Sequence, residues 1–361
     1  MHKRHLSECG RGDVTVTKSE IYVDYEYGDL KEVIVGVPLI IYPDLKGADW
    51  TQEALKILPE SERKKTIERS GKTSIEIGKY DAMEAENQVL ISIFQDHGIK
   101  VWRPEVLSRE RLAINLGEDT LRHFGVAFQY SRDPMVVIGD NVIELAPASL
   151  PRIADLLAYR RLFMDRVMGS NAKWFAMPRV DYSTMFEGGC YDKNTFPTLE
   201  GGDIHVLGTK ILVGNSMNAT VGSNELGYTW LTSILEPQGY SIERVPITEE
   251  FQHLDIVLSV VRPGLAIVCH DAFVNGIPSY FDGWKLIEVS KDDAQRMATN
   301  GMPIDPNHYI MSYNERYDGK RVQKELEAEG ITVYRIFFGN HNEDGGSIRC
   351  STHPLLRRLS G

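Results

Sequence analysis

Residues 202–214 read GDIHVLGTKILVG, and this stretch decides the fold class. An apolar, partly β-branched run comes before Gly208-Thr209 and a second run follows, which predicts two antiparallel strands joined by a tight turn. Three further stretches share this form, with Gly, Asn or Pro in the turn. They read LKEVIVGVP from Leu30, DPMVVIGDNVIEL at 133–145 and LDIVLSVVRPGLAIVCHD at 254–271.

Helical patterns alternate with these strand pairs, and each ends at a glycine, a frequent residue after the last turn of a helix. Further strands, IKVWRP at 99–104 and ITVYRI at 331–336, follow the first and the last helical pattern. Strand pairs and helices that alternate every roughly 50–70 residues predict repeated ββαβ units around one axis. The helical patterns cover 80–98, 150–169, 224–239 and 319–330.

A doubly wound parallel sheet is the competing fold. It requires a glycine-rich nucleotide-binding turn after an early strand, whereas the glycines of GGDIHVLG precede their strand. Segments 181–200 and 273–316, rich in Pro, Asn and Asp, predict long ordered loops over a site. We therefore expect a single α/β domain, 21–361, after a polar and mobile N-terminal extension, 1–20.

The charge and hydropathy of the chain exclude several classes of partner. The 361 residues carry a formal net charge of −11, which disfavours nucleic acid and anionic membranes as partners. The N-terminus, MHKRHLSECGRGDVTVTKSE, lacks the apolar core of a secretory signal, and the longest apolar stretch is broken by Arg262-Pro263. We expect a cytoplasmic protein that acts on small molecules, and cationic ligands suit its charge.

Four cysteines, Cys9, Cys190, Cys269 and Cys350, are far apart in the sequence. Without a CxxC pair they predict neither a disulfide framework nor a structural zinc site. Cys269 ends the apolar run LAIVC and is expected in the core. Cys190, in EGGCYD, and Cys350, in GGSIRCST, both follow glycines and remain rival candidates for a nucleophile.

Residues capable of chemistry occupy equivalent places in the repeated units, at or just before a strand. If the units surround one axis, these positions meet at one end of it, so that a thiol, an imidazole and three carboxylates share a pocket. Each residue also has a structural explanation, because an aspartate at a strand start commonly accepts turn amides. The residues are Asp133, Asp203, His253, Asp255 and Cys350.

Such a pocket suits sulfur chemistry on a cation. A thiolate is a strong nucleophile, a nearby imidazolium lowers its pKa, and a carboxylate can orient that imidazole. Two further carboxylates are superfluous for acyl transfer, but they pair well with a planar guanidinium. The expected reaction is attack of sulfur on the guanidinium carbon, with protonation of the departing amine by the histidine.

Together these motifs resemble the amidinotransferases, which include glycine amidinotransferase and bacterial enzymes of aminocyclitol, cyanotoxin and phytotoxin synthesis. The resemblance runs from LKEVIVGVP to the C-terminus, and it is carried by RDPMVVIGDNVIELAP, NAKWFAMPRVDY, EGGDIHVLGTKILVGNS, HLDIVLS and GGSIRCST. It implies an α/β-propeller of five pseudo-symmetric ββαβ units, a pentein-like fold. It also implies a homodimer without metal or organic cofactor.

The resemblance assigns roles to individual residues. Cys350 is expected to carry the amidino group, His253 to act as general acid and base, and Asp203 to support the histidine. Asp133 and Asp255 are expected to bind the guanidinium. L-arginine is the implied donor and leaves as L-ornithine before an acceptor amine enters, in ping-pong order.

Recognition of the donor's carboxylate departs from the family pattern. Ala272 and Ala298 stand where the family has an arginine and a serine. Arg262 or another basic residue would then have to bind the carboxylate. Asn300 keeps its family position and is expected in the substrate site.

The residues before the histidine, Glu250-Phe251-Gln252, are more polar and acidic than in the family. This predicts that Glu250 and Gln252 contact the acceptor amine. A polar or cationic acceptor, such as lysine or an amine of a natural-product pathway, fits them better than glycine.

Two other functions stay open. A hydrolase on the same scaffold, such as an arginine deiminase or dihydrolase, would use the same cysteine, histidine and aspartate with water in place of the amine. A non-enzymatic protein that binds a guanidino compound would have no use for the thiol. The resemblance along nearly the whole chain favours transfer, in secondary metabolism or toxin synthesis.

Overall fold

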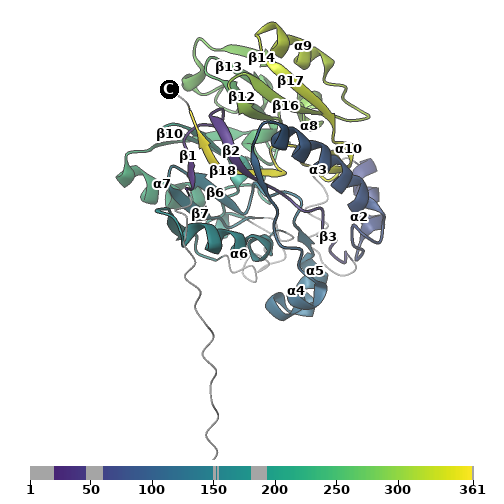
Figure 1. The fold of residues 1–361 in the computed structure, drawn as a ribbon. Helices are drawn as coiled ribbons and strands as arrows, with labels where there is room; N and C mark the ends of the chain where they lie inside the picture. The colour runs from purple at the N-terminus through teal and green to yellow at the C-terminus, as the bar shows by residue number, and fades with distance from the viewer. Residues whose placement is uncertain (1–19, 46–59, 149–151, 153, 180–192, 360–361) are drawn as a thin grey trace, which may run out of the picture.

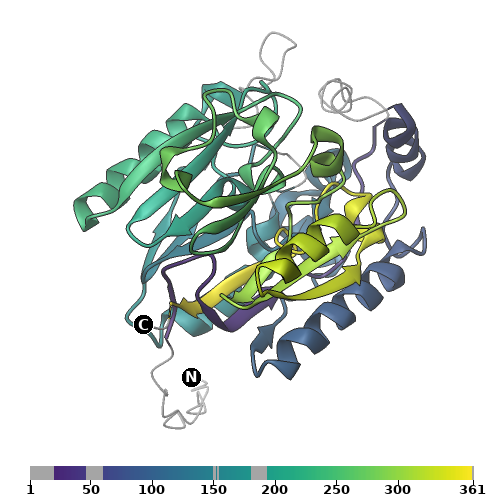
Figure 2. The ribbon, with the colours of Figure 1, turned by 90° about the horizontal axis from the view of Figure 1, so that it is seen from above.

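The computed structural model describes residues 20–45, 60–148, 152, 154–179 and 193–359. Within these ranges the chain forms five units, each built on a sheet of three or four strands, and the longer helices lie around the outside (Figure 1; Figure 2). Of the expected N-terminal extension, 1–20, only Glu20 is described. No helix in the described ranges is long and apolar enough to cross a membrane.

One unit illustrates the pattern that the others repeat. Strand β9 (Ile204–Leu207) pairs antiparallel with β10 (Lys210–Ser216), as the turn at Gly208 predicts. Helix α7 (Glu225–Leu235) follows, and its first turn is capped by the Asn224 side chain, which accepts a hydrogen bond from Gly227. Strand β11 (Ser241–Ile247) then pairs parallel with β10. This is the predicted ββαβ order.

Three further units follow the same pairing pattern. In the unit of β12–β14 two short 3-10 helices, η7 (His270–Ala272) and η8 (Ser279–Phe281), replace the α-helix. The strands and helices of the three units are β6 (Met135–Ile138), β7 (Asn141–Glu144), α6 (Asp155–Val167) and β8 (Lys173–Ala176); β12 (Leu258–Arg262), β13 (Leu265–Val268) and β14 (Lys285–Glu288); β15 (Met302–Asp305), β16 (His308–Tyr313), α9 (Lys320–Ala328) and β17 (Thr332–Phe337).

The two ends of the described chain build the fifth unit together. The last strand, β18 (Thr352–Arg358), pairs antiparallel with β2 (Asp29–Val35). After α3 (Lys79–Asp96), strand β4 (Lys100–Trp102) pairs parallel with β2. The chain therefore closes the ring with its own termini, and β18 takes the place of the first strand in this unit.

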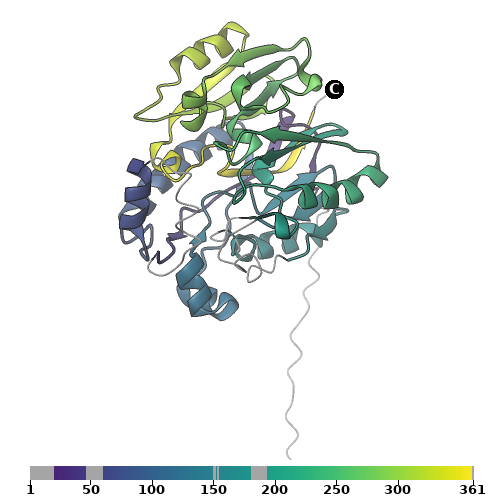
Figure 3. The ribbon, with the colours of Figure 1, turned by 180° about the vertical axis from the view of Figure 1, so that it is seen from behind.

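Smaller elements decorate the ring, and Figure 3 shows α4 and α5 projecting from its edge. A short sheet pairs β3 with β5, and β1 adds to β18. The remaining bounds are β1 (Tyr22–Val23), β3 (Ile40–Ile41), α2 (Glu60–Arg69), α4 (Arg109–Leu116), α5 (Glu118–Phe124), β5 (Val126–Ala127), η3 (Lys193–Thr195), η4 (Gly201–Asp203), η5 (Glu236–Gln238), η6 (Leu254–Ile256), α8 (Lys291–Gln295) and α10 (Gly339–Asn342).

Apolar side chains between neighbouring units hold the ring together. Helix α3 places Leu90, Ile91 and Phe94 on one face, as its helical spacing requires, and this face packs into a cluster with Ile310 and Ile336 of the next unit. Full burial of such a side chain stabilises by about 1.5–3 kcal/mol. The packing fixes the units relative to one another and therefore fixes the strand ends that carry the site.

The prediction of a long loop over 273–316 is wrong. This segment holds η8 and β14, which complete one unit, then α8, and then β15 and β16, which begin the next unit. Pro303 lies in β15, an edge strand with a bulge between Pro303 and Asp305, where a missing N–H is tolerated. Some of the residues that suggested a loop, such as Pro306 and Asn307, form turns, and others lie within strands or helices. Of the other predicted loop, 181–200, only 193–200 is described.

Candidate active site

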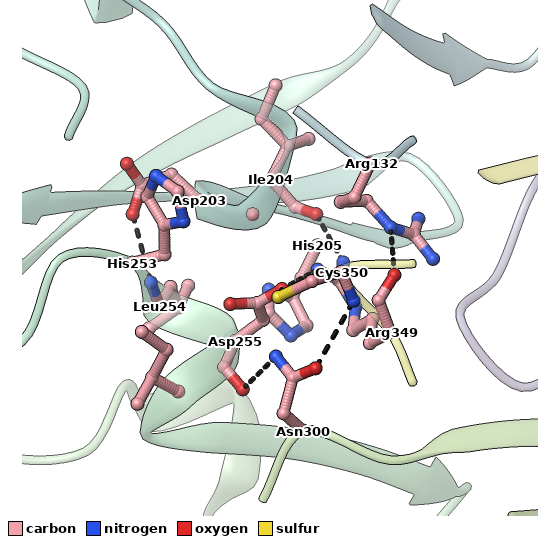
Figure 4. A network of polar contacts seen from close by, with 12 residues as sticks. Arg132, Asp203, Ile204, His205, His253, Leu254, Asp255, Asn300, Arg349 and Cys350 are labelled. Carbon is pink, nitrogen blue, oxygen red and sulfur yellow. Dashed lines mark hydrogen bonds and ion pairs between the residues drawn. The ribbon is translucent and has the colours of Figure 1, made fainter. Parts of the chain in front are cut away.

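Five strand starts converge at the candidate site, as the repeat predicts. Each predicted residue of the catalytic and guanidinium-binding set comes one to five positions before the first strand of a unit, and all of them are buried. Figure 4 shows most of them together. They are Asp133 before β6, Asp203 before β9, His253 and Asp255 before β12, Asn300 before β15 and Cys350 before β18.

The Cys350 thiol is buried next to a carboxylate. Its Sγ lies 3.6 Å from Oδ2 of Asp255, to which it donates, and its backbone N–H donates to Oδ1 of Asn300 at 3.2 Å. Burial raises the pKa of the thiol well above its ordinary value, and the charges of Asp255 and Asp133 raise it further. The free protein therefore holds Cys350 as a neutral thiol.

Asp255 has one occupied and one free oxygen. Its Oδ2 accepts from the Cys350 thiol and from Nη1 of Arg349 at 3.0 Å. Its Oδ1 is buried and has no hydrogen-bond partner among the described residues. A buried carboxylate oxygen without a donor is costly, so this atom is available to an N–H group of a bound ligand.

Arg349, unexplained by the sequence, anchors this carboxylate. Its Nε and Nη2 donate to Glu26 at 3.2 and 3.1 Å, and Nη2 also donates to the carbonyl of Ile204 at 2.8 Å. Burial lowers the pKa of Arg349, but Glu26 and Asp255 outweigh it and hold the pKa above its ordinary value. Arg349 is thus a permanent cation between two carboxylates. The candidate nucleophile, Cys350, is the next residue in the chain.

His253 is paired with a carboxylate that the sequence analysis missed. Its Nε2 is hydrogen-bonded to Oε2 of Glu200, and its Nδ1 lies 3.8 Å from Oδ1 of Asp133. Burial lowers the pKa of His253, but Asp133 and Glu200 raise it to about 10. Burial raises the pKa of Glu200, but His253 lowers it to about 2. The pair is therefore ionic at neutral pH.

Asp203 has other partners. Its Oδ1 accepts from the N–H of Leu254 and its Oδ2 from the N–H of Ser223, both at 2.9 Å. Burial raises its pKa. Asp203 thereby fixes the backbone next to His253, whereas Glu200 makes the hydrogen bond to the imidazole. The support of His253 predicted for Asp203 remains a prediction, with Glu200 as its rival.

The motif EGGD carries the signal that could have identified Glu200. The acid before the two glycines and the acid after them enter the same site from one short turn. A Cβ on Gly202 would lie 2.5 Å from Nδ1 of His253, so glycine is required for the imidazole to approach this turn. The N–H of Gly202 also donates to Oδ1 of Asp133 at 3.0 Å.

Asp133, predicted to bind the guanidinium, is already paired. Its Oδ2 accepts from Nη1 of Arg152 at 2.8 Å. Arg152 also donates to Asp155 and to the carbonyl of Tyr130. Burial raises the pKa of Asp155 to about 8, against the lowering effect of Arg152. Asp255 is therefore better placed than Asp133 to receive a new donor.

The two residues predicted to contact the acceptor, Glu250 and Gln252, lie in different environments. The Gln252 side chain donates from Nε2 to Oε2 of Glu200 at 3.1 Å, so it lies beside His253. Glu250 forms an ion pair with Lys291 at 2.9 Å, and its side chain is 43% exposed. Gln252 thus belongs to the buried site, and Glu250 lies at the surface.

The structure describes some of the remaining candidates, which are the residues considered for the donor's carboxylate and the other cysteines. Arg262 donates from Nη2 to the carbonyl of Glu329 at 2.8 Å, and the buried Ala272 and Ala298 offer no charge for the donor's carboxylate. Cys269 is a buried core residue, as predicted. Cys9 and Cys190 lie outside the described residues.

A ring of five ββαβ units whose strand starts bring together a cysteine, a histidine and several carboxylates defines a pentein-like α/β-propeller. No protein-family model matches the chain. Among curated proteins, the chain is similar to the L-arginine:L-lysine amidinotransferase of Pseudomonas savastanoi pv. phaseolicola, with 26% identity over 92% of this chain and 93% of that protein. It is also similar to mitochondrial glycine amidinotransferase of Xenopus tropicalis, with 21% identity over 96% and 85%.

Solved structures agree in fold. SxtG, an amidinotransferase of saxitoxin biosynthesis from Microseira wollei, superposes with a TM-score of 0.70 at 21% identity, covering 94% of this chain and 98% of its own. The inosamine-phosphate amidinotransferase StrB1 from Streptomyces griseus gives 0.70 at 19%, covering 95% and 98%. DDAH from Pseudomonas aeruginosa gives 0.59 at 15%, covering 90% and 99%. The resemblance to amidinotransferase enzymes and the predicted α/β-propeller are confirmed.

Proposed function

We propose that the protein transfers the amidino group of L-arginine to an amine acceptor through an amidino-cysteine at Cys350. The observation that carries this proposal is the free Oδ1 of Asp255, buried beside the thiol. A guanidinium N–H donated to this oxygen would satisfy the buried acceptor. The same contact would bring the guanidinium carbon next to the sulfur.

The positive charge of the substrate would lower the pKa of the Cys350 thiol, which is high in the free protein. Asp255 and Asp133 oppose a thiolate, and a bound guanidinium offsets their charge, so the pKa of Cys350 falls when the donor binds. The thiol proton leaves to solvent, and the thiolate attacks the guanidinium carbon. Cationic His253 then donates its proton to the amine nitrogen of the donor as the bond from this nitrogen to the guanidinium carbon breaks. L-ornithine departs, and a cationic amidino group stays on sulfur.

The second half-reaction reverses the proton movement. His253, now neutral, accepts a proton from the incoming amine, and the amine attacks the amidino carbon. The carbon–sulfur bond breaks with its electron pair on sulfur, the guanidino product leaves as a cation, and the thiolate regains a proton from solvent. Glu200 stabilises the imidazolium in both half-reactions, because it is hydrogen-bonded to Nε2.

The acceptor is a polar or cationic amine such as lysine or an amine of natural-product or toxin synthesis. Supporting this, Gln252 lies next to the Glu200–His253 pair, and the curated relative from Pseudomonas savastanoi is named for lysine. SxtG is assigned to saxitoxin biosynthesis. Relative rates with lysine, glycine and aminocyclitols test the choice, and a clear preference for glycine would contradict it. The homodimer and the cytoplasmic location remain predictions.

Mass spectrometry after addition of L-arginine tests the donor, the nucleophile and the intermediate together. We expect an amidino adduct on the peptide containing Cys350, and loss of the adduct and of turnover in Cys350→Ala. The Cys190→Ala variant is the matched control, because Cys190 also follows two glycines. An adduct on Cys190, or turnover by Cys350→Ala, would show that the wrong cysteine was chosen. A protein that only binds guanidino compounds would give no adduct.

Hydrolysis of arginine is the second candidate function. It is favoured by the fold, since DDAH and the arginine dihydrolase domain of ArgZ also superpose, the latter with a TM-score of 0.59 at 14% identity. Incubation with L-arginine alone distinguishes the two functions. Citrulline formed without any amine supports the hydrolase, whereas ornithine that forms only with an acceptor supports transfer.

A further inference from the structure

A second cluster of ligand-type side chains lies between two neighbouring units of the ring. His97 directly follows α3, and Asp305 and His308 flank the turn between β15 and β16. One ligand atom of each side chain lies within 4.8 Å of the other two. Asp305 is at the opposite end of β15 from Asn300, so the cluster does not belong to the candidate active site.

We propose that His97, Asp305 and His308 bind a divalent transition-metal ion of the zinc class. Imidazole nitrogens and a carboxylate oxygen are ligands that zinc, cobalt and nickel accept, and three protein ligands leave one position for water. The three side chains are partly exposed, so an ion can enter from solvent. The site goes beyond the proposed transfer reaction, which needs no metal.

Two of the three ligands are already in contact. Nδ1 of His308 lies 2.9 Å from both carboxylate oxygens of Asp305. With metal–ligand bonds of about 2.0–2.2 Å, adjacent ligand atoms of a tetrahedral site stand about 3.4 Å apart. This pair therefore needs to widen by a few tenths of an ångström, while His97 closes in by side-chain rotation.

Packing keeps the ring of the third ligand, His97, beside that of His308. The ring of His97 meets that of His308 edge-on, with centroids 4.8 Å apart, and Nε2 of His97 is hydrogen-bonded to the hydroxyl of Tyr334 at 2.9 Å. Phe94 of α3 and Ile310 of β16 share one apolar cluster, which fixes the two backbones. A metal ion would thus join α3 to the β15–β16 hairpin.

A turn contact is the simpler explanation of part of the cluster. Asp305 also accepts from the N–H of Asn307 at 2.8 Å, as an aspartate in a turn commonly does. That contact accounts for Asp305 and its pairing with His308. It does not account for His97, which comes from another unit.

Zinc titration of the full chain tests the site. The background carries Cys350→Ala, and His2, His5 and Cys9 are replaced by Ala, because those side chains can also bind zinc. Calorimetry should find about one equivalent of Zn²⁺ bound. We expect His97→Phe, which keeps the ring packing, and His308→Gln to weaken binding by at least about tenfold, as loss of even an outer partner does.

His270→Ala is the matched control. His270 is an exposed histidine whose Nδ1 lies 3.6 Å from Asp271, so it presents a similar pair without a third ligand. We expect this variant to bind Zn²⁺ as the background does. Zinc should also raise the melting temperature of the background and of His270→Ala, but not of His97→Phe or His308→Gln.

Two results would overturn the site: no zinc binding by the background, or unchanged affinity in both His97→Phe and His308→Gln. If the His97→Phe variant does not fold, the Asp305→Asn variant is tested in its place. We expect it to weaken Zn²⁺ binding by the same factor. Co²⁺ gives an independent readout, because a His and Asp ligand set produces no thiolate-to-cobalt charge-transfer band. Appearance of that band would assign the metal to a cysteine and contradict the proposal.

Discussion

Glu200 is hydrogen-bonded through Oε2 to Nε2 of His253, while Asp203, three residues further on, accepts from the backbone N–H groups of Ser223 and Leu254. The two acids of one short turn therefore act on the histidine in different ways. Glu200 holds the imidazole by a direct hydrogen bond and, after Asp133, contributes to raising the pKa of His253 to about 10, to which the charge of Asp203 adds less. Asp203 sets the position of the backbone next to it.

Glu200→Gln should impair proton transfer without removing the side chain's volume. Loss of the carboxylate lowers the pKa of His253, so less imidazolium is available to protonate the departing amine at alkaline pH. We expect kcat to fall by about 10²–10⁴-fold, the range for a general acid–base group, and the alkaline limb of its pH profile to move to lower pH. Steady-state kinetics from pH 6 to 10 measure both.

Asp203→Asn is the control for this prediction. It should lower the melting temperature, because one amide acceptor is lost in a buried turn. The alkaline limb should move less than in Glu200→Gln, because the charge of Asp203 raises the pKa of His253 less than Glu200 does. If Asp203→Asn moves that limb as far as Glu200→Gln does, Asp203 supports the imidazole as the sequence predicted, and the assignment to Glu200 is wrong.

The same ion pair should shape stability against pH. The pKa of His253 rises from its ordinary 6.5 to about 10, so its stabilisation is complete below pH 6.5 and is lost as the pH rises toward 10. The pKa of Glu200 falls from 4.5 to about 2, so its stabilisation is complete above pH 4.5 and is lost as the pH falls toward 2. The free energy of unfolding should therefore decline outside pH 4.5 to 6.5.

Urea unfolding at pH 7 and pH 9.5 measures how much the free energy of unfolding declines on the alkaline side. Wild-type protein should lose more free energy of unfolding over this interval than Glu200→Gln, whose histidine has lost a partner. His270→Ala, which removes an exposed imidazole, should keep the wild-type loss. An equal loss in wild type and Glu200→Gln would contradict the charged state assigned to His253.

Glu26→Gln should destabilise the centre of the ring. Arg349 is buried between Glu26 and Asp255, and removing one partner of a buried ion pair costs about 3–5 kcal/mol. An exposed pair offers the comparison: Asp140→Asn removes the partner of Lys173 at 3.3 Å and should cost at most about 1 kcal/mol. Equal effects of the two substitutions on the free energy of unfolding would sink the idea that Arg349 depends on Glu26.

Much of this arrangement was predictable, because repeats show in sequence. Apolar runs around turns such as Gly208 predict strand pairs, and placing Asp133, Asp255 and Cys350 before equivalent strands follows from the repeat alone. Strands β15 and β16 were missed, since Pro303 at an edge-strand bulge resembles a loop residue, whereas α9 and β17 of the same unit lie where a helix and a strand were predicted. A local pattern does not reveal which strand edge a proline occupies.

The contacts of charged side chains were harder to predict. EGGD offers two acids within four residues, and only the turn geometry shows that Glu200 is the one hydrogen-bonded to His253. Arg349 pairs with Glu26, which lies at the other end of the chain, so no spacing rule connects them. Such pairings depend on how the ring closes, and sequence periodicity does not contain that information.

Asp255→Asn should make the Cys350 thiol more reactive while it abolishes turnover. The charge of Asp255 raises the pKa of the thiol, so its removal lowers that pKa and increases the thiolate at pH 8, by about tenfold for each pKa unit. The same change removes the free carboxylate oxygen proposed to bind the donor, so amidino transfer should stop. Iodoacetamide labelling followed by peptide mass spectrometry measures the first effect, and ornithine release measures the second. Cys269, buried in the core, should stay unlabelled in both proteins. Slower labelling of Cys350 in Asp255→Asn than in wild type would mean that Asp255 promotes the thiolate, and the proposed activation by substrate charge would be wrong.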